Sequence, residues 1–555
     1  MAAPESSPDA LVEAGRLALA NGSWEEARAQ FTAALEGSER AEALEGLGLA
    51  SWWLDDAALT LDARERAYRA YRERGDARGA ARVAIWLTWD YLAFRGEFAV
   101  ASGWLERARR LLEGQERTAE YGWLLTREGE LDLFRRHDPR RAQELGRRAA
   151  ELGRAVGDAG VEMNGLALEG LALVTAGDVT AGMRRLDEAT AAATAGEVKE
   201  LHAVGVVCCW QMFACERVRD YDRATQWCHR VKEFAKRWRN VPLSGVCRSQ
   251  YAGVLIWRGQ WAEAEAELAE AARDLGSTKP AMVGQAMARL GELRLRQGRL
   301  DEAAHLFDQG QSYPAALLGR AALLLERDDA AGAAVEIERL LRQTHPEERT
   351  SRASAVELSV RAQVRLGDLE EADRGLAELE SIAADVGTEP LRASVREAQG
   401  VIAAARGNHR DAGARFEEAA DLYQRSGAPF EASRARLELA EELAHAGTRE
   451  RSRQVAGAAA AALRALGAAR AAERGETLVR ELQAPRKARA PKAALTHRQL
   501  EILKMVASGS SNGEIAARMS LSEHTVKRHV ANILTRLGLK TRAAAAAQAT
   551  RLGLL

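Results

Sequence analysis

Between residues 10 and 480 the sequence repeats one pattern at a spacing of about forty residues. A small residue is followed seven positions later by glycine, and then in most copies by an apolar residue, a small residue, a large apolar residue and another small residue. A period of this length is typical of folds built from stacked, repeated units. The clearest copies and the centres of the looser ones are Gly15, Gly22, Trp24, Ala27, Phe31, Ala34; Gly170, Gly177, Val179, Gly182, Leu186, Ala189; Ala252, Gly259, Trp261, Ala264, Leu268, Ala271; Gly291, Gly298, Leu300, Ala303, Phe307, Gly310; Gly400, Gly407, His409, Ala412, Phe416, Ala419; and Gly96, Arg136, Arg219, Gly367 and Gly447.

Each copy predicts two antiparallel helices with the glycine in the turn between them. Small residues where the two helices cross allow interaxial distances of about 8 Å, the close end of the usual range. The large residue, Phe31 or Phe307, is expected to fill the gap between one pair and the next. Because no pair can bury its apolar faces alone, we expect the pairs to stack into a superhelix.

This region resembles the tetratricopeptide-repeat family, in the somewhat longer variety found in bacterial regulators. The resemblance implies an all-α chain. We expect a disordered N-terminus over residues 1–10, tetratricopeptide-like helical repeats over residues 11–483, a basic linker over residues 484–494 and a separate domain over residues 495–555. Such arrays hold partners, peptides or small ligands, or couple domains, so the resemblance says more about fold than about function.

The family pattern turns a set of aromatic and acidic residues toward the concave side of the first helices. All twelve Trp residues lie before residue 262. A groove of this composition would suit a peptide or a cationic or aromatic ligand. The alternative is that these side chains fill space between repeats, as is expected of Trp24 and Trp261. The candidate groove residues are Trp52, Trp86, Asp90, Trp123, Glu130, Phe213 and Glu216.

The other reactive residues indicate neither an enzyme nor a metal site. No paired-carboxylate or Ser/His/Asp arrangement stands out, and Gly276–Pro280 lacks the frame of a phosphate-binding loop. We therefore expect no catalytic residue, no cofactor and no metal. The cysteines are odd in number and match no common zinc spacing, so we expect small buried hydrophobic residues rather than a metal or redox sensor: Cys208, Cys209, Cys215, Cys228 and Cys247, with His202 and His229 among them.

The first nine residues have neither the basic start nor the apolar core of a signal peptide. No segment approaches the roughly 18 apolar residues that a membrane span needs. These two observations predict a cytoplasmic protein without a membrane partner.

The net charge of −1 conceals a strong asymmetry. Residues 485–555 carry 13 Lys and Arg against 3 Asp and Glu, a net charge of +10, which leaves −11 for the rest of the chain. A basic end on an acidic body fits a polyanionic partner for that end alone, because neutralising phosphates releases counterions. Within this end, residues 484–492 hold two prolines, four basic residues and no apolar period, and predict an exposed linker. The alternative for the charge itself is an ordinary solvated surface.

Helix-capping residues divide the last sixty residues into four short helices. Gly509 ends the first helix, Gly538 ends the third, and Thr541 caps a fourth that runs through residues 543–547 to Leu552. Ser520 and Leu521 form the turn between the second and third helices, which is the spacing of a helix-turn-helix. The caps of the first three helices are Thr496 with Gln499, Ser511 with Glu514, and Ser522.

The third helix has two contrasting faces. Its apolar stripe is spaced by four, three and four positions, and is expected to pack on the first two helices: Val526, Val530, Ile533 and Leu537. The opposite stripe is polar and basic: His524, Lys527, Arg528, Ala531 and Thr535. An exposed basic face on the second helix of such a pair is what entry into the major groove requires.

Residues 495–555 resemble the LuxR-type helix-turn-helix domain of bacterial transcription regulators. The resemblance rests on Leu-Thr-x-Arg, Ser-Asn-x-Glu-Ile-Ala, Leu-Ser-x-x-Thr-Val-Lys-x-His and Leu-Gly, and places the helix-turn-helix motif from Asn512 to Ala531. Gln499 departs from the glutamate usual in the family, which puts a charge interaction in the domain core in doubt. His529 is expected to pack internally.

By this resemblance, one set of residues faces DNA base edges: Lys527, Arg528 and Ala531. A second set lies near the phosphate backbone: Ser511, Asn512, Thr525 and Lys540. Arg528 is the best candidate for bidentate contact with guanine, whereas Ala531 offers only apolar contact, for instance with a thymine methyl group.

The resemblance implies a sequence-specific DNA-binding transcription regulator whose repeat array senses a protein or small ligand. The partners expected are double-stranded DNA, the effector, and a second copy of the chain through the fourth helix. The alternative role of that helix is simple closure of the four-helix core. The alternative function is a repeat-based protein-interaction adaptor with only weak, non-specific DNA anchoring.

Overall fold

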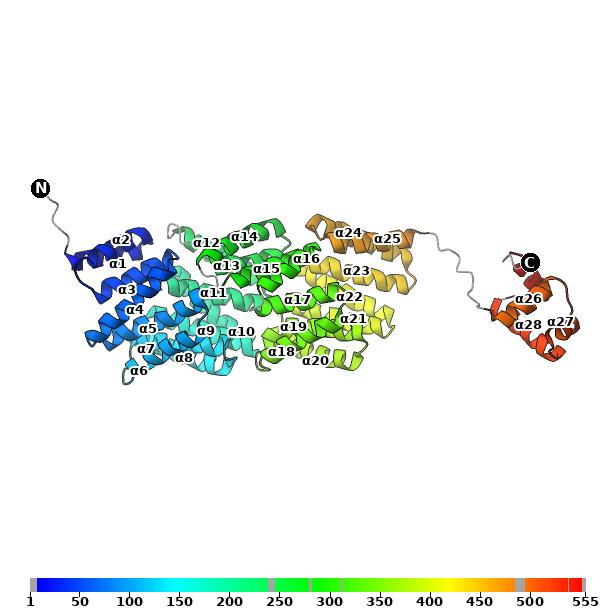
Figure 1. Cartoon of the computed structure of the whole chain (residues 1–555), viewed down its shortest axis with the longest axis horizontal. Coiled ribbons are helices and arrows are strands. Elements are labelled where there is room, and N and C mark those ends of the chain that lie inside the picture. The colour runs from blue at the N-terminus through cyan, green and yellow to red at the C-terminus, as the bar shows by residue number, and fades with distance from the viewer. Residues whose placement is uncertain are drawn as a thin grey trace. The chain divides into compact units, whose positions relative to one another are not determined.

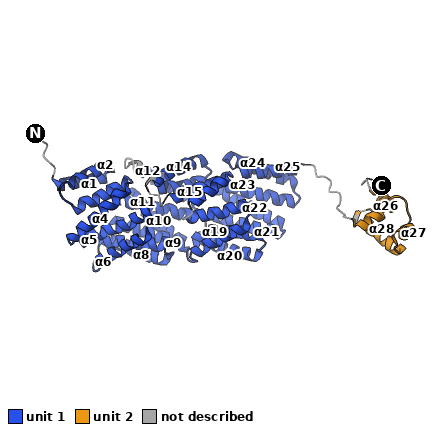
Figure 2. Cartoon of the chain, viewed as in Figure 1, with its two compact units in different colours: residues 1–482 blue, residues 483–555 orange. Residues whose placement is uncertain are grey.

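The computed structural model describes residues 7–237, 245–278, 282–310, 313–484, 495–537 and 539–551. Within these residues the regular secondary structure is helical, as the sequence predicted. The chain divides into two compact units, residues 1–482 and residues 483–555 (Figure 2). Among the described helices, none combines the length and the apolarity needed to cross a lipid bilayer.

The first unit is an array of antiparallel helix pairs in which each helix packs against its neighbours along the chain (Figure 1). This confirms the repeat architecture expected from the sequence. The first helices of the pairs are α1 (Pro8–Ala20), α3 (Ala41–Trp53), α5 (Ala77–Asp90, continued by the π-helix η1, Tyr91–Arg95), α7 (Ala119–Phe134), α9 (Ala159–Ala176), α11 (Leu201–Arg217), α13 (Gly245–Trp257), α15 (Val283–Gln297), α17 (Pro314–Glu326), α19 (Arg349–Leu366), α21 (Glu389–Ala405) and α23 (Pro429–His445). The second helices are α2 (Trp24–Ala34), α4 (Ala57–Glu73), α6 (Phe98–Leu111), α8 (Pro139–Val156), α10 (Val179–Ala195), α12 (Tyr221–Arg237), α14 (Trp261–Thr278), α16 (Leu300–Gln309), α18 (Ala330–Gln343), α20 (Leu369–Val386), α22 (His409–Arg425) and α24 (Arg449–Leu466), and α25 (Ala469–Gln483) follows the last pair.

The large residue of the repeat fills the gap between successive pairs, as predicted. Phe31 is fully buried between Gly15 of α1, in its own pair, and Gly46 of α3, in the next pair. A Cβ atom on Gly15 would lie 2.7 Å from the Phe31 ring, and one on Gly46 only 2.3 Å. Glycine is therefore required on both sides of the ring. The same arrangement recurs at Phe307 with Gly291 and Gly319.

Two further pairs have aspartate instead of glycine in the turn. Asp55, between α3 and α4, and Asp328, between α17 and α18, adopt left-handed backbone conformations with φ of 58° and 61°. Aspartate tolerates this region better than most residues because its short polar side chain can hydrogen-bond locally. These pairs have the helical architecture of the others without their glycine signature.

The array begins earlier than the sequence predicted. Helix α1 starts at Pro8, so residues 8–10, which were expected to be disordered, are helical. The Ser7 hydroxyl accepts the N–H of Ala10 at 3.3 Å, and proline suits the first position of a helix because that position needs no N–H donor. Residues 1–6 lie outside the described residues, and so does the predicted linker after Ala484.

Parts of the array that are distant in sequence pack against one another. The Thr350 hydroxyl of α19 donates to the Val174 carbonyl of α9 at 2.9 Å, across 176 positions. The Trp257 indole of α13 donates to the Ser426 carbonyl, after α22, at 3.4 Å and across 169 positions. The later half of the array therefore lies against the earlier half.

Charged side chains form a paired network where these halves meet. Arg219 binds Glu357 at 2.9 Å, while Glu397 binds both Arg361, at 2.5 Å, and Arg434, at 3.0 Å. Burial alone would raise the pKa of Glu357, but the charges of Arg219 and Arg361 lower it to about 2. Glu357 is therefore ionised at neutral pH, and the network holds its arginines by specific contacts.

A second buried ion pair joins α4 to α5 near the start of the array. Arg64 is 2% exposed and Asp90 has no exposed surface, and the two side chains are hydrogen-bonded. The Arg64 guanidinium also lies 4.6 Å from the ring centroid of Trp86. The pair is therefore held between two helices with little contact with water.

The cysteines lie in and around α11 to α13. Cys208, Cys215 and Cys228 are buried, and burial raises the pKa of the Cys228 thiol to about 12. At neutral pH this thiol is protonated, as expected of a small hydrophobic residue. Cys209 of α11 and Cys247 of α13 are half-buried, and their sulfur atoms lie 2.9 Å apart.

Candidate nucleic-acid interface

The second unit contains α26 (His497–Ala507), α27 (Asn512–Met519), α28 (Glu523–Leu537) and α29 (Arg542–Arg551). Both predicted capping boxes form, and Thr541 caps α29 as expected. Each box holds two backbone N–H groups that a helix start would otherwise leave without partners. The cap hydrogen bonds are Gln499 N–H to Thr496 (3.3 Å), Thr496 N–H to Gln499 (3.0 Å), Glu514 N–H to Ser511 (3.3 Å), Ser511 N–H to Glu514 (2.6 Å) and Thr525 N–H to Ser522 (3.1 Å).

A short turn sets α28 against α27. Ser520 occupies the left-handed region with φ of 54°, and the N–H of Leu521 donates to the carbonyl of Ala516 at 3.0 Å. The left-handed residue and this hydrogen bond end α27, and the chain is redirected into α28 within three residues. The predicted helix-turn-helix geometry therefore follows from local capping at both sides of the turn.

The apolar stripe of α28 packs on the other helices of the unit, as predicted. Its side chains join one core with residues of α26, α27 and α29, and this core encloses the inner face of α28. The members from α28 are Val526, Val530 and Ile533, with Leu537 partly buried, and they meet Ile502, Leu503, Val506, Ile515, Ala516, Met519, Ala545 and Ala549.

The opposite stripe of α28 faces solvent. All five of its predicted members are exposed: His524, Lys527, Arg528, Ala531 and Thr535. Lys527 makes only a loose ion pair with Glu523, at 3.8 Å, and Arg528 makes no hydrogen bond or ion pair with any described residue. The guanidinium of Arg528 is thus available to a ligand, and base contact by Lys527, Arg528 and Ala531 stays a prediction.

The residues predicted near the phosphate backbone lie at helix starts. The Ser511 hydroxyl accepts the N–H of Glu514 at 3.3 Å in the cap of α27. The Thr525 hydroxyl lies 2.7 Å from the Ser522 hydroxyl in the cap of α28. The Asn512 side-chain oxygen accepts from Arg542 at 2.7 Å, while Lys540 is exposed. Helix N-termini favour anions because their free N–H groups can donate hydrogen bonds and the positive end of the helix dipole lies there. Phosphate contact by these residues also stays a prediction.

Two arginines have structural roles that sequence reasoning missed. Arg498 of α26 donates to the Met519 carbonyl at 2.7 Å and closes the end of α27. Arg542 of α29 donates to the Ser510 carbonyl as well as to Asn512. Arg498 stands within one of the motifs noted above, but the pattern does not show which carbonyl it binds. His529 is half-buried, which agrees with internal packing.

We expect Ser511→Ala to destabilise the second unit by about 1 kcal/mol, because the variant loses the cap of α27. Thermal unfolding of residues 483–555, followed by circular dichroism, measures the change. Ser508→Ala is the matched control, since the exposed Ser508 hydroxyl donates only to the Met505 carbonyl and caps no helix start. Equal destabilisation by both substitutions would show that the capping box contributes nothing specific.

The residues of the candidate groove already have partners within the array. Trp52 and Trp86 pack edge-on against His202, with ring centroids 5.1 and 4.6 Å away, and Asp90 binds Arg64. Burial raises the pKa of Glu130, which is ion-paired with Arg127. The remaining members are half-buried. Trp123 packs on the hydrophobic core of the array, the ring centroids of Phe213 and Phe134 are 6.2 Å apart, and Glu216 is ion-paired with Arg289. A ligand-binding role for this set stays a prediction.

Residues 493–549 match the family described as bacterial regulatory proteins, luxR family. The chain is 44% identical over 55 residues to the nitrate/nitrite response regulator protein NarP of Escherichia coli, a match to 10% of this chain and 26% of NarP. It is 43% identical over 61 residues to the transcriptional regulatory protein LiaR of Bacillus subtilis, which covers 11% of this chain and 29% of LiaR. The chain thus spans little more than a quarter of the length of these relatives.

Among solved structures, the whole chain is similar to one from the APC/C hetero-tetramer Cut9–Hcn1. The superposition covers 98% of this chain and 96% of the other, with a TM-score of 0.43 and 12% sequence identity.

Proposed function

We propose that this chain, whose C-terminal unit is a LuxR-family helix-turn-helix domain, is a sequence-specific DNA-binding transcription regulator. The observation that carries the proposal is the two-faced helix α28, which buries an apolar stripe in the domain core and leaves a basic stripe open to solvent. A helix presented in this way can enter the major groove while its own domain supports it from behind.

In the proposed complex, α28 lies in the major groove with Lys527, Arg528 and Ala531 toward the bases. The starts of α27 and α28, together with Lys540, lie at the phosphates on either side. Arg528 supplies hydrogen bonds that distinguish guanine, and the phosphate contacts set the position of the helix. The reaction is binding alone, and no chemical step is involved.

The fourth helix is the proposed contact between two copies on DNA. Ala545 and Ala549 of α29 are buried in the domain core, while Ala543 and Ala547 are exposed on another face. Small exposed residues allow two helices to approach closely. A symmetric pair would then read two related half-sites.

The repeat array is the proposed receiver of the regulatory signal, in the cytoplasm where the DNA lies. Its acidic surface and its stacked helices suit a protein or small-ligand effector. Binding there would control how freely the DNA-binding unit is exposed or dimerised.

The salt dependence of DNA binding tests the proposal against the adaptor alternative. Full-length protein selected on random double-stranded DNA should enrich one sequence. At physiological salt that sequence should bind at least about 1,000-fold more tightly than scrambled DNA of equal length. If no site is enriched and the affinity for both sequences falls equally with salt, the result favours an adaptor with non-specific anchoring.

A further inference from the structure

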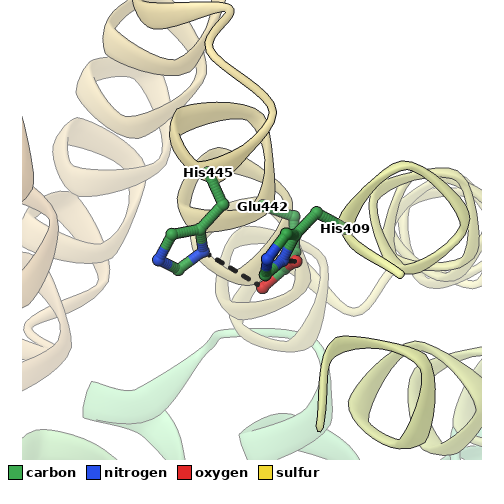
Figure 3. Close-up of side chains that lie close together, drawn as sticks. All are labelled: His409, Glu442 and His445. Atoms are coloured by element: carbon green, nitrogen blue, oxygen red, sulfur yellow. Dashed lines mark hydrogen bonds and ion pairs between the residues drawn. The ribbon is translucent and has the colours of Figure 1, made fainter. Parts of the chain in front are cut away.

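Two histidines and a glutamate meet where α22 packs on α23. His409 is the first residue of α22, and Glu442 and His445 lie in the last turn of α23 (Figure 3). The Nδ1 atom of His409 is 2.7 Å from one Glu442 carboxylate oxygen, and the Nδ1 atom of His445 is 3.8 Å from the other. One ligand atom from each residue lies within 4.8 Å of the other two.

The partners of Glu442 set this cluster apart from most buried carboxylates of the array, although buried Glu348 likewise pairs with a histidine, His137. Glu442 is only 7% exposed, and its ion-pair partners among the described residues are these two histidines, with no arginine or lysine. Other buried carboxylates bind arginine: Asp90 binds Arg64, Asp132 binds Arg136 and Arg141, and Glu397 binds Arg361 and Arg434. Buried carboxylates are usually paired with a positive group, and a cation held by Glu442 and the two histidines would supply one.

The three side chains are a ligand set that zinc prefers. Two imidazoles and one carboxylate, with a fourth position open, are a common set for zinc at 2.0–2.2 Å from each ligand. The three-residue spacing of Glu442 and His445 places both on one face of α23, and His409 comes from the neighbouring helix. The His409 and His445 rings are 4.7 Å apart, so small side-chain rotations would bring all three to one ion.

The site is accessible from solvent. His445 is exposed, and His409 lines an open depression of about 660 Å³ together with Asn408 and Asp411. An ion can therefore enter, and water or a side chain of a partner can fill the fourth position.

We infer that His409, Glu442 and His445 form a binding site for a divalent transition-metal ion, with zinc as the best match. The ion takes the place of the direct contact between His409 and Glu442 and neutralises the buried carboxylate. Because its ligands come from two helices, the ion fastens α22 to α23 near the C-terminal end of the array. Copper and nickel would compete for the same nitrogen-rich site.

Zinc binding to the full-length, untagged protein after chelator treatment tests this site. In calorimetric titrations with zinc chloride, His409→Ala, Glu442→Gln and His445→Ala should each weaken the site at least about 100-fold. Exposed His305 in α16 provides the control, and His305→Ala should bind as the wild type does. Zinc should also raise the midpoint of thermal unfolding of the wild type but not of His445→Ala.

Cobalt(II) distinguishes this site from the cysteines, because thiolate ligands give an intense near-ultraviolet charge-transfer band that imidazole and carboxylate do not. We expect visible cobalt bands that disappear in His409→Ala and His445→Ala, without thiolate charge transfer. The inference is overturned if these variants keep the zinc stoichiometry and affinity of the wild type. It is equally overturned if all bound cobalt shows thiolate ligation.

Discussion

Arg528→Ala should weaken binding to the preferred DNA site about 5- to 150-fold, while binding to scrambled DNA changes far less. The expected loss follows from one bidentate contact with guanine, worth about 1–3 kcal/mol. Arg528 is exposed on α28 and makes no hydrogen bond or ion pair with any described residue, so its removal leaves the fold of the domain intact. Fluorescence anisotropy with the selected site and with single-base variants measures the effect. The loss should vanish on a site in which the contacted guanine is replaced.

Lys540→Ala is the matched control for charge. Lys540 is exposed and is assigned to the phosphate backbone, so its removal should weaken binding to all sequences alike. It should also reduce the slope of the logarithm of the binding constant against the logarithm of the salt concentration by about 1. The same uniform loss is expected for Lys492→Ala, whose position lies outside the described residues. If Arg528→Ala and Lys540→Ala weaken specific and scrambled DNA equally, the division into base and phosphate contacts is wrong.

Asp90→Ala should destabilise the N-terminal part of the array by about 3–5 kcal/mol, the cost of leaving a buried charge without its partner. The unpaired group is the Arg64 guanidinium, which is 2% exposed and is packed on Trp86. Chemical unfolding followed by tryptophan fluorescence measures the loss, and hydrogen exchange in α4 and α5 locates it.

Asp62→Ala is the control, since Asp62 binds Arg66 on the exposed side of the same helix α4. An exposed pair of this kind contributes about 0–1 kcal/mol, so this variant should unfold nearly as the wild type does. Replacing both members of the buried pair, with Arg64→Met and Asp90→Leu together, should recover most of the stability. Equal effects of Asp90→Ala and Asp62→Ala would contradict the role assigned to burial.

Features with a local physical cause could be predicted from the sequence. The capping boxes at Thr496 and Ser511 involve residues three positions apart, so the residue types alone predict the hydrogen bonds. The position of Phe31 against Gly15 follows from spacing along one helix pair. The turns at Asp55 and Asp328 have the same left-handed backbone conformation as the glycine turns. Aspartate does not match the glycine of the repeat pattern, so the pattern does not predict these two turns.

Features that depend on distant parts of the chain could not be predicted. His409 and Glu442 are 33 positions apart on separate helices, and neither matches a metal-binding motif. The pairing of Arg64 with Asp90, and the position of His202 between Trp52 and Trp86, also require the stacking angle of successive pairs. Periodicity predicts that pairs stack, but this angle depends on packing details that a single sequence does not display.

The contacts between the two halves of the array limit how the gene for this protein can evolve. Repeat proteins commonly gain and lose whole units by duplication and deletion, because each unit contacts only its neighbours. Here the hydrogen bonds from Thr350 to Val174 and from Trp257 to Ser426 join units separated by 176 and 169 positions. Adding or removing one pair between α9 and α19 would bring every later pair opposite the wrong partner. The number of units between these contacts is therefore fixed by the structure.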